Sequence, residues 1–112
     1  MKGEVQKYIE AIPPEYRPLF DRLHALVLQV HPKAEVGFSY KMPRYKVGPR
    51  RIFVAVWKHG VSIYGVGPGA DAGFIARHPD LIASRRTIRL RPEDAAALSD
   101  AEFRETFRAA LD

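Results

Sequence analysis

Four short runs with strand character follow one another between residues 36 and 66, and the connections between them are too short to hold a helix. The runs cover residues 36–40, 44–47, 52–58 and 61–66, with Gly48-Pro49 and His59-Gly60 at two of the turns. Strands joined by tight turns pair with their neighbours in antiparallel fashion. The sequence therefore predicts an antiparallel meander. Its run at 52–58 is apolar on both faces over most of its length, as in a central strand.

Helical patterns flank this meander. Apolar residues recur three and four positions apart over residues 5–12 and over 16–30. Residues 70–77 predict a short helix, 79–83 a turn, 87–91 a fifth strand and 92 onward a helix, and a capping box at Ser99 and Glu102 precedes the last helix. We expect one domain over residues 1–112 with an α+β fold. It is a two-layer sandwich whose mainly antiparallel sheet of about five strands carries the N- and C-terminal helices on one face.

The charge is concentrated in one part of the chain. Residues 36–91 contain eleven Lys or Arg and only two acids, Asp71 and Asp80, and the whole chain has a net charge of +5. Surfaces that serve only solubility mix the two signs. The sequence thus predicts a basic face or cleft that meets an anionic molecule.

Absent residue types exclude several classes of protein. There is no cysteine, which excludes disulfides, thiolate metal sites and cysteine nucleophiles. The longest purely apolar stretch, residues 52–57, is far shorter than the roughly 20 residues that span a bilayer. Because no apolar leader follows Met1-Lys2-Gly3, we expect a cytoplasmic protein with no membrane partner.

The first candidate site is the segment 39–46, which places two tyrosines and three cations around Pro43. A proline supplies no N–H to a sheet, so we expect it to interrupt strand pairing and bend the chain. Two interpretations stay open: a polar bend in an edge strand, or a lip that presents phenol and ammonium groups to a ligand. The second assigns ligand contacts to Tyr40, Met42, Tyr45 and Lys46.

The β-hairpin and glycine-rich segments add further candidates. His59 lies at a hairpin tip, where it is either simply solvated or a hydrogen-bonding group, and Tyr64 on the following strand supplies a hydroxyl. Gly67 and Gly69 lie between a strand and a predicted short helix. Free N–H groups at such a junction attract anions, although a plain turn explains the glycines as well.

A basic strand completes the set of candidates. If residues 85–91 form a strand, one of its faces holds Arg85, Thr87 and Arg89. A core strand with a solvated basic face explains this pattern. A role in binding requires that the face borders the lip at residues 40–46.

Metal binding and catalysis have little support. The four histidines lie apart, without the spacing of a zinc site, and no catalytic triad or carboxylate pair stands out. The sequence predicts no metal site and identifies no cofactor. Whether the protein is an enzyme stays open, with binding alone favoured and His59 as the general base if a reaction is catalysed.

Several blocks also occur in the order and spacing of a known family. They are Tyr8-Ile9 to Ile12-Pro13, residues 23–32, Ser39-Tyr40-Lys41-Met42-Pro43 with Tyr45-Lys46, Lys58-His59, Ile63-Tyr64, Gly67-Pro68 and Thr87-Ile88-Arg89. On these residues the chain resembles the YdhG-like family of small bacterial domains, some of which are described as frataxin-like intracellular iron chaperones. The resemblance implies a helix-on-sheet sandwich and a link to iron handling. The chain differs from the family pattern at Arg86, where glycine is common.

Two functions remain in contention. The first is a small binding protein whose basic, Tyr- and His-lined cleft holds a small anionic ligand or an acidic protein partner. Its predicted contacts are Tyr40, Met42, Tyr45, Lys46, His59, Tyr64, Gly67, Gly69, Arg85, Thr87 and Arg89. The second is sequence-nonspecific binding of nucleic acid through residues 41–51 and 85–91, with Tyr40 or Tyr45 stacked on bases. The oligomeric state stays open.

Overall fold

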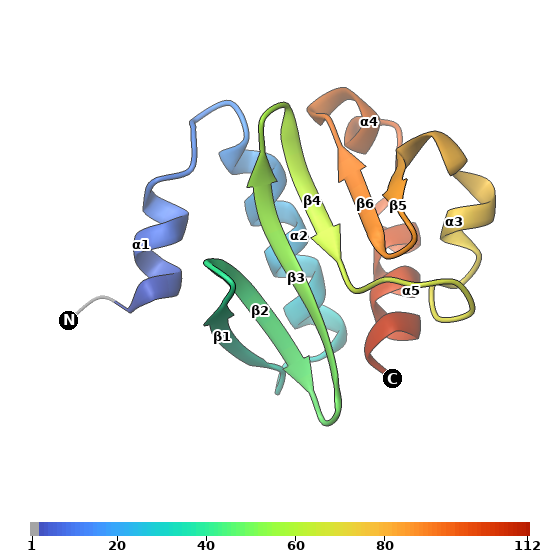
Figure 1. Cartoon of the computed structure of the whole chain (residues 1–112), viewed down its shortest axis with the longest axis horizontal. Helices are drawn as coiled ribbons and strands as arrows, with labels where there is room; N and C mark the ends of the chain where they lie inside the picture. The colour runs from blue at the N-terminus through green and yellow to red at the C-terminus, as the bar shows by residue number, and fades with distance from the viewer. Residues whose placement is uncertain (1–2) are drawn as a thin grey trace.

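The computed structural model describes residues 3–112, which form a six-stranded antiparallel sheet and five α helices (Figure 1). Met1 and Lys2, on which the expectation of no apolar leader partly rests, lie outside the described residues. The strand order is β1-β2-β3-β4-β6-β5. The predicted α+β class is confirmed. In chain order the elements are α1 (Glu4–Glu10), α2 (Arg17–Val30), β1 (Glu35–Ser39), β2 (Met42–Val47), β3 (Arg50–Trp57), β4 (Gly60–Tyr64), α3 (Phe74–Arg77), the 3₁₀ helix η1 (Pro79–Leu81), β5 (Ile82–Ser84), β6 (Thr87–Leu90), α4 (Pro92–Ala96) and α5 (Asp100–Leu111).

The sheet has one more strand than the sequence predicts. The additional strand, β5, overlaps the predicted turn at residues 79–83 and pairs with β6 through an irregular register. Three residues with a bulge give no alternating pattern that is long enough to detect. The basic strand β6 is consequently an inner strand, and Arg85 and Arg86 form the turn that joins it to β5.

The predicted interruption of strand pairing at Pro43 is found toward β3 and is wrong toward β1. Tyr40 and Lys41, with φ of 54° and 62°, form the two-residue turn between β1 and β2, a conformation that matches the twist of paired strands. Pro43 then lies within β2 and is paired with β1. Its missing N–H costs no ladder hydrogen bond, because β2 pairs with β3 only from Arg44 opposite Phe53 onward.

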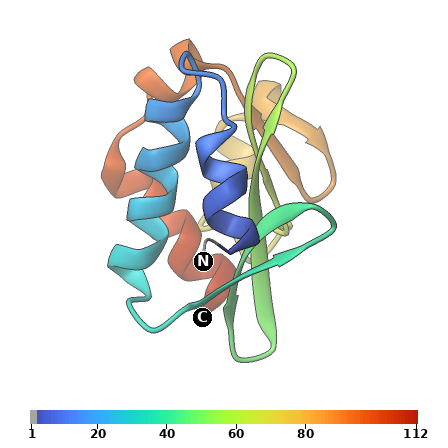
Figure 2. The same cartoon turned by 90° about the vertical axis from the view of Figure 1, so that its left-hand side faces the viewer.

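Helices α1, α2 and α5 lie together on one side of the strands (Figure 2). The apolar stripe predicted over residues 16–30 faces the sheet, as the period of 3.6 requires. Within the described chain, no helix covers the other side of the strands β2, β3 and β4 (Figure 1). The largest fully buried side chains of the core are Phe20, Leu23, Val27, Tyr45, Ile52, Ile63, Phe74, Ile88, Leu90, Phe103, Phe107 and Leu111.

The helix layer also supplies hydrogen-bond partners to the part of β3 that extends beyond β2. The Val56 N–H donates a hydrogen bond to the Tyr8 hydroxyl on α1 (2.8 Å), and the Tyr16 hydroxyl donates to the Lys58 carbonyl (3.3 Å). These hydroxyls replace the neighbouring strand that β3 lacks there. The tip of the β3–β4 hairpin is therefore held against the helices.

Candidate functional site

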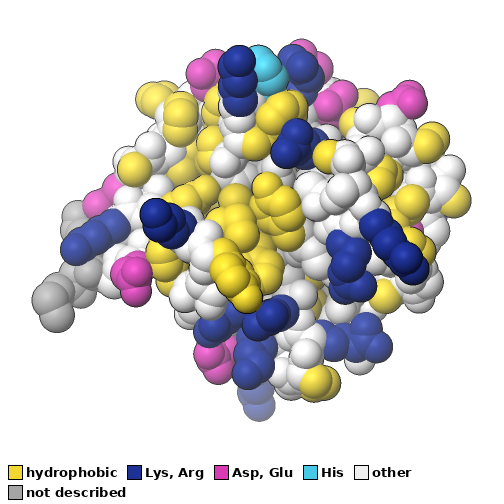
Figure 3. Space-filling view, in the orientation of Figure 1, with side chains coloured by type: hydrophobic (Ala, Val, Ile, Leu, Met, Phe, Trp, Pro, Cys, Tyr) yellow, Lys and Arg dark blue, Asp and Glu magenta, His cyan; other side chains and the backbone are white. Residues whose placement is uncertain are grey.

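The side of the sheet without helices is lined by alternate residues of β2, β3, β4 and β6, and we call it the open face. On β3, Ile52 and Val54 belong to the core between the layers, so Phe53 points the other way. The open face comprises Met42, Arg44, Lys46, Arg51, Phe53, Ala55, Trp57, Ser62, Tyr64, Thr87 and Arg89. Figure 3 shows hydrophobic side chains at its centre and Lys and Arg side chains around them. The predicted basic surface is thus an aromatic patch with a cationic rim.

Tyr40 lies over one part of this patch. Its side chain is 74% exposed, the highest value among the large hydrophobic residues that the structure describes. Its ring lies 5.8 Å from the ring of Phe53 in an edge-to-face arrangement, and the Arg51 guanidinium lies 5.8 Å from the same ring. Phe53 is only 8% exposed as a result. Tyr40 therefore offers a free aromatic ring above a buried one.

Trp57 forms a second aromatic centre, next to the β3–β4 turn. The guanidinium groups of Arg89 and Arg91 lie 5.0 and 5.9 Å from its ring, and the His59 ring meets it edge-on at 5.2 Å. The indole N–H of Trp57 and the hydroxyl of Ser62 are buried, and neither has a hydrogen-bond partner within residues 3–112. Buried polar groups normally have partners. This end of the open face thus holds two donors whose partners are not supplied by the described chain.

Most cations of the rim have no carboxylate partner. No ion pair with an Asp or Glu of the described chain is formed by nine of them: Lys41, Lys46, Arg50, Arg51, Lys58, Arg85, Arg86, Arg89 and Arg91. Arg44 differs, because its guanidinium lies 3.0 Å from Glu35 and donates to the Ser39 hydroxyl (2.9 Å). Gly37 leaves room for this guanidinium, since a Cβ there would collide with it. Arg44 is therefore already engaged, whereas the rest of the rim is available to an anion.

Three of these arginines share a cleft of about 500 Å³ at the end of the sheet opposite the β3–β4 turn. We call it the arginine cleft. It lies between the β2–β3 turn, the end of β4, the start of β6 and the C-terminal part of α5. Its lining residues are Pro49, Arg50, Arg51, Phe53, Tyr64, Gly65, Arg86, Thr87 and Ala110.

The backbone of Gly65 fixes one wall of the arginine cleft. Its N–H donates to the Arg86 carbonyl (2.9 Å), and its own carbonyl accepts a hydrogen bond from the Arg86 guanidinium (3.0 Å). Gly65 has a φ of +101°, and a Cβ there would lie 2.8 Å from the Arg51 carbonyl oxygen. Only glycine fits this position without strain. The guanidinium of Arg86 is thereby positioned with further N–H groups still free to donate.

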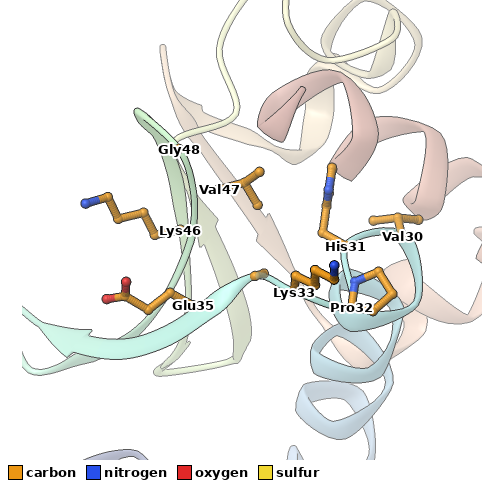
Figure 4. Close-up of a pocket in the computed structure, with 9 residues that line it drawn as sticks. Val30, His31, Pro32, Lys33, Glu35, Lys46, Val47 and Gly48 are labelled. Atoms are coloured by element: carbon orange, nitrogen blue, oxygen red, sulfur yellow. The ribbon is translucent and has the colours of Figure 1, made fainter.

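A larger cleft of about 610 Å³ lies elsewhere, between the α2–β1 connection and β2 (Figure 4). Val47 and His31 face each other across it, while the side chains of Lys46 and Glu35 point away. The His31 Nε2 atom is 2.9 Å from an Asp112 carboxylate oxygen, although the angle is not that of a hydrogen bond. The walls of this larger cleft carry both positive and negative charges. Its greater volume therefore does not make it a better anion site than the arginine cleft.

The structure brings most of the predicted contacts to one surface. Six of them lie on the open face or at its rim: Tyr40, Met42, Lys46, Tyr64, Thr87 and Arg89. Arg85 is exposed in the β5–β6 turn, and His59 joins the surface through its contact with Trp57. The basic strand does not border the lip at residues 40–46 directly, because β3 and β4 lie between β2 and β6. The two segments instead flank a shared aromatic centre.

Tyr45 does not belong to this surface, which corrects the prediction. Its side chain is fully buried, and its hydroxyl lies 2.7 Å from the His24 Nδ1 atom on α2. Burial raises the pKa of the Tyr45 hydroxyl far above its usual value and lowers the pKa of His24. The alternation along β2 accounts for the error, since Arg44 and Lys46 point outward and the residue between them must point inward.

Gly67 and Gly69 do not lie directly before a helix N-terminus. The helix that follows, α3, starts only at Phe74, and its first N–H groups are already occupied. The Asp71 carboxylate accepts hydrogen bonds from the N–H groups of Ile75 (2.8 Å) and Gly73 (3.3 Å). Gly67 is buried beneath the side chain of Arg86, which a Cβ would approach to 2.9 Å. Of the two, Gly67 leaves room for the Arg86 side chain, whereas Gly69 has open space around it.

Sequence reasoning missed Phe53, Trp57 and Ser62. Residues 52–57 indicate a central strand that is apolar on both faces. The signal that could have found them is the set of positions 51, 53, 55 and 57, which holds Arg, Phe, Ala and Trp. Two aromatic rings and a cation on one face of a strand indicate a surface that is not a second core.

The described residues contain no group of three or more His, Asp or Glu side chains that could hold a metal ion. Among the helices of residues 3–112, none has the length and apolar character needed to cross a membrane.

Comparison with family models, with curated proteins and with solved structures gives no match. The resemblance to YdhG-like domains accordingly stays a prediction.

Proposed function

We propose that the protein binds a small ligand that carries a phosphate or a similarly charged anionic group in the arginine cleft. The observation that carries this proposal is the convergence of Arg50, Arg51 and Arg86, none of which pairs with a carboxylate of residues 3–112, on one cleft. Guanidinium groups bind phosphate and carboxylate oxygens through two parallel hydrogen bonds. Three neighbouring cations repel one another, and a bound anion removes that repulsion.

The rest of the cleft suits a small organic anion. Tyr64 and Thr87 add hydroxyl groups from adjacent strands, and Phe53 adds an apolar surface. A volume of about 500 Å³ lies in the range of small-molecule sites. Because Gly65 already holds Arg86 in place, less side-chain freedom is lost on binding.

The link to iron handling that the family resemblance implies needs a particular form of iron here. The residues that line the arginine cleft include no Asp, Glu or His. Ferrous and ferric ions prefer oxygen and imidazole ligands, which this cleft supplies only as hydroxyls and backbone carbonyls. The positive charge of the arginines would also repel a free iron ion. Iron would reach this cleft only as an anionic complex. That version of the proposal predicts binding of a polycarboxylate chelate and no binding of ferrous iron alone.

Isothermal titration calorimetry with pyrophosphate tests the proposal. Arg50→Gln should weaken binding about ten- to a hundredfold, because a charge-assisted hydrogen bond contributes roughly 1.5–3 kcal/mol. Lys7→Gln is the matched control, since it removes one positive charge from α1 on the other side of the sheet. Equal losses in both variants would mean that pyrophosphate responds only to net charge. That result, or no binding by the wild type, would refute the arginine cleft as a ligand site.

A further inference from the structure

The structure assigns a second binding activity to the open face: we propose that it binds single-stranded nucleic acid, with bases on Tyr40, Tyr64 and Trp57. This inference goes beyond a small ligand in the arginine cleft and does not depend on it. Tyr40 and Trp57 do not line that cleft, whereas Tyr64 belongs to both surfaces.

The first argument is the layout of the aromatic rings. Tyr40 stands at the β1–β2 turn, Tyr64 at the C-terminal end of β4 and Trp57 next to the β3–β4 turn. Trp57 and Phe53, which is paired with Tyr64, lie four positions apart on β3, about 13 Å at the usual rise per residue. Sheets that bind single-stranded RNA use aromatic side chains on an uncovered face to stack about two or three bases. An uncovered sheet with three separate rings meets this requirement.

The second argument is the cations around these rings. Lys and Arg side chains surround the patch (Figure 3). Within the described residues, no ion pair with a carboxylate is formed by Lys41, Lys46, Lys58, Arg89 or Arg91, although Asp80 and Asp94 line the same cleft as the two arginines. A single strand follows such a rim with its phosphates while its bases turn toward the aromatic rings. Arg89 already lies over the Trp57 ring, so a base can stack on the outer plane of its guanidinium.

The third argument separates nucleic acid from an acidic protein. An acidic segment would use the cations but would leave unexplained the exposed ring of Tyr40. The combination of stacking surface and cations therefore favours a single strand. A duplex fits less well, because a broad sheet face does not enter a groove.

The chain's single tryptophan makes the test direct, because its fluorescence reports on Trp57 alone. The protein is titrated with a mixed-sequence DNA strand of about ten nucleotides, a length within known site sizes. An abasic strand of equal length, the corresponding duplex and polyglutamate are titrated in parallel. We expect quenching by the intact strand and at least about tenfold weaker binding of the other three, since stacking contributes roughly 1–3 kcal/mol per base. The salt dependence should have a log–log slope of roughly −3 to −4 for about five phosphate contacts.

Two variants connect binding to the proposed residues. Tyr40→Ala removes an exposed ring and should weaken binding about tenfold without changing the melting temperature. Arg89→Gln should weaken binding and reduce the salt slope by about 0.7. Lys7→Gln, on α1, should leave binding and slope nearly unchanged.

The outcomes also distinguish nucleic-acid binding by the open face from ligand binding in the arginine cleft. Equal binding of the abasic strand, or no effect of Tyr40→Ala, would overturn the stacking role. Tighter binding of polyglutamate would assign the face to an acidic protein instead. Arg50→Gln should weaken pyrophosphate binding about ten- to a hundredfold while retaining Trp57 quenching by the intact strand. Each proposal can therefore fail without the other.

Discussion

The two faces of the sheet are made by the same strands but have opposite relations to the rest of the molecule. On the covered face, Ile52, Ile63 and Leu90 meet helices that the chain itself supplies. On the open face, Trp57 and Ser62 keep buried donors without a partner in the described chain, next to cations that form no ion pair with its carboxylates. Buried polar groups normally have partners, so the two faces differ in how well the described chain satisfies them. The covered face thus accounts for the stability of the fold, and the open face carries the groups on which the proposed binding activities rest.

The largest test of this comparison replaces one residue on each face. Leu23→Ala, in the fully buried stripe of α2, should lower the free energy of unfolding by about 2–5 kcal/mol through lost apolar contact and a cavity. Tyr40→Ala, on the open face, should change it by at most about 0.5 kcal/mol. Urea unfolding followed by circular dichroism measures both. Similar costs for the two substitutions would mean that the open face is part of the core.

A smaller effect is expected where the open face meets the arginine cleft. Gly65→Ala forces a side chain into a φ of +101° and within 2.8 Å of the Arg51 carbonyl oxygen. The strain should cost about 1–3 kcal/mol and displace the strand ends that carry Arg51 and Arg86. Pyrophosphate binding should therefore weaken more than binding of the DNA strand. If the variant unfolds at the wild-type urea concentration and still binds pyrophosphate normally, the glycine is not needed for the geometry of the cleft.

Tyr45→Phe sharpens the comparison from the covered side. The substitution removes the hydroxyl that lies 2.7 Å from His24 and keeps the buried ring. Leaving the His24 nitrogen without this partner should cost about 1–2 kcal/mol of unfolding free energy. Because Tyr45 does not reach the open face, binding of pyrophosphate and of the DNA strand should stay at wild-type values. Weaker binding at unchanged stability would restore Tyr45 to the ligand site.

The helical and strand periods predict the architecture well, because each period is a property of residues that lie close together in the sequence. The apolar stripe over residues 16–30 and the four runs between residues 36 and 66 identify α2 and the meander. Strand β5 escapes detection because its three residues are too few to show a period. Pro43 misleads because the cost of a proline depends on whether the next strand has begun pairing, and that register is a tertiary property.

The candidate site was predictable only in part, for a related reason. Charge concentration indicates a basic surface, and strand alternation alone would have removed Tyr45 from it. What the sequence cannot show is that β3 and β4 separate the two basic segments and place Phe53 and Trp57 between them. The arginine cleft likewise combines residues 49–53, 64–65, 86–87 and 110, which only folding brings together.

The smallest expected effect concerns the pH dependence of stability on the covered face. Burial lowers the pKa of His24 in the folded protein, and the nearby Asp21 opposes this shift only in part. The unfolded chain, in which histidine has a pKa of about 6.5, therefore binds a proton more readily than the folded protein does. The resulting stability is fully present above about pH 6.5 and is lost as the pH falls toward the folded pKa. His24→Gln should flatten the dependence of the unfolding free energy on pH just below 6.5, measured by urea unfolding at several pH values. An NMR titration midpoint for His24 at or above 6.5 in the wild type would contradict the assignment, and it would mean that the covered face admits water at the His24–Tyr45 pair.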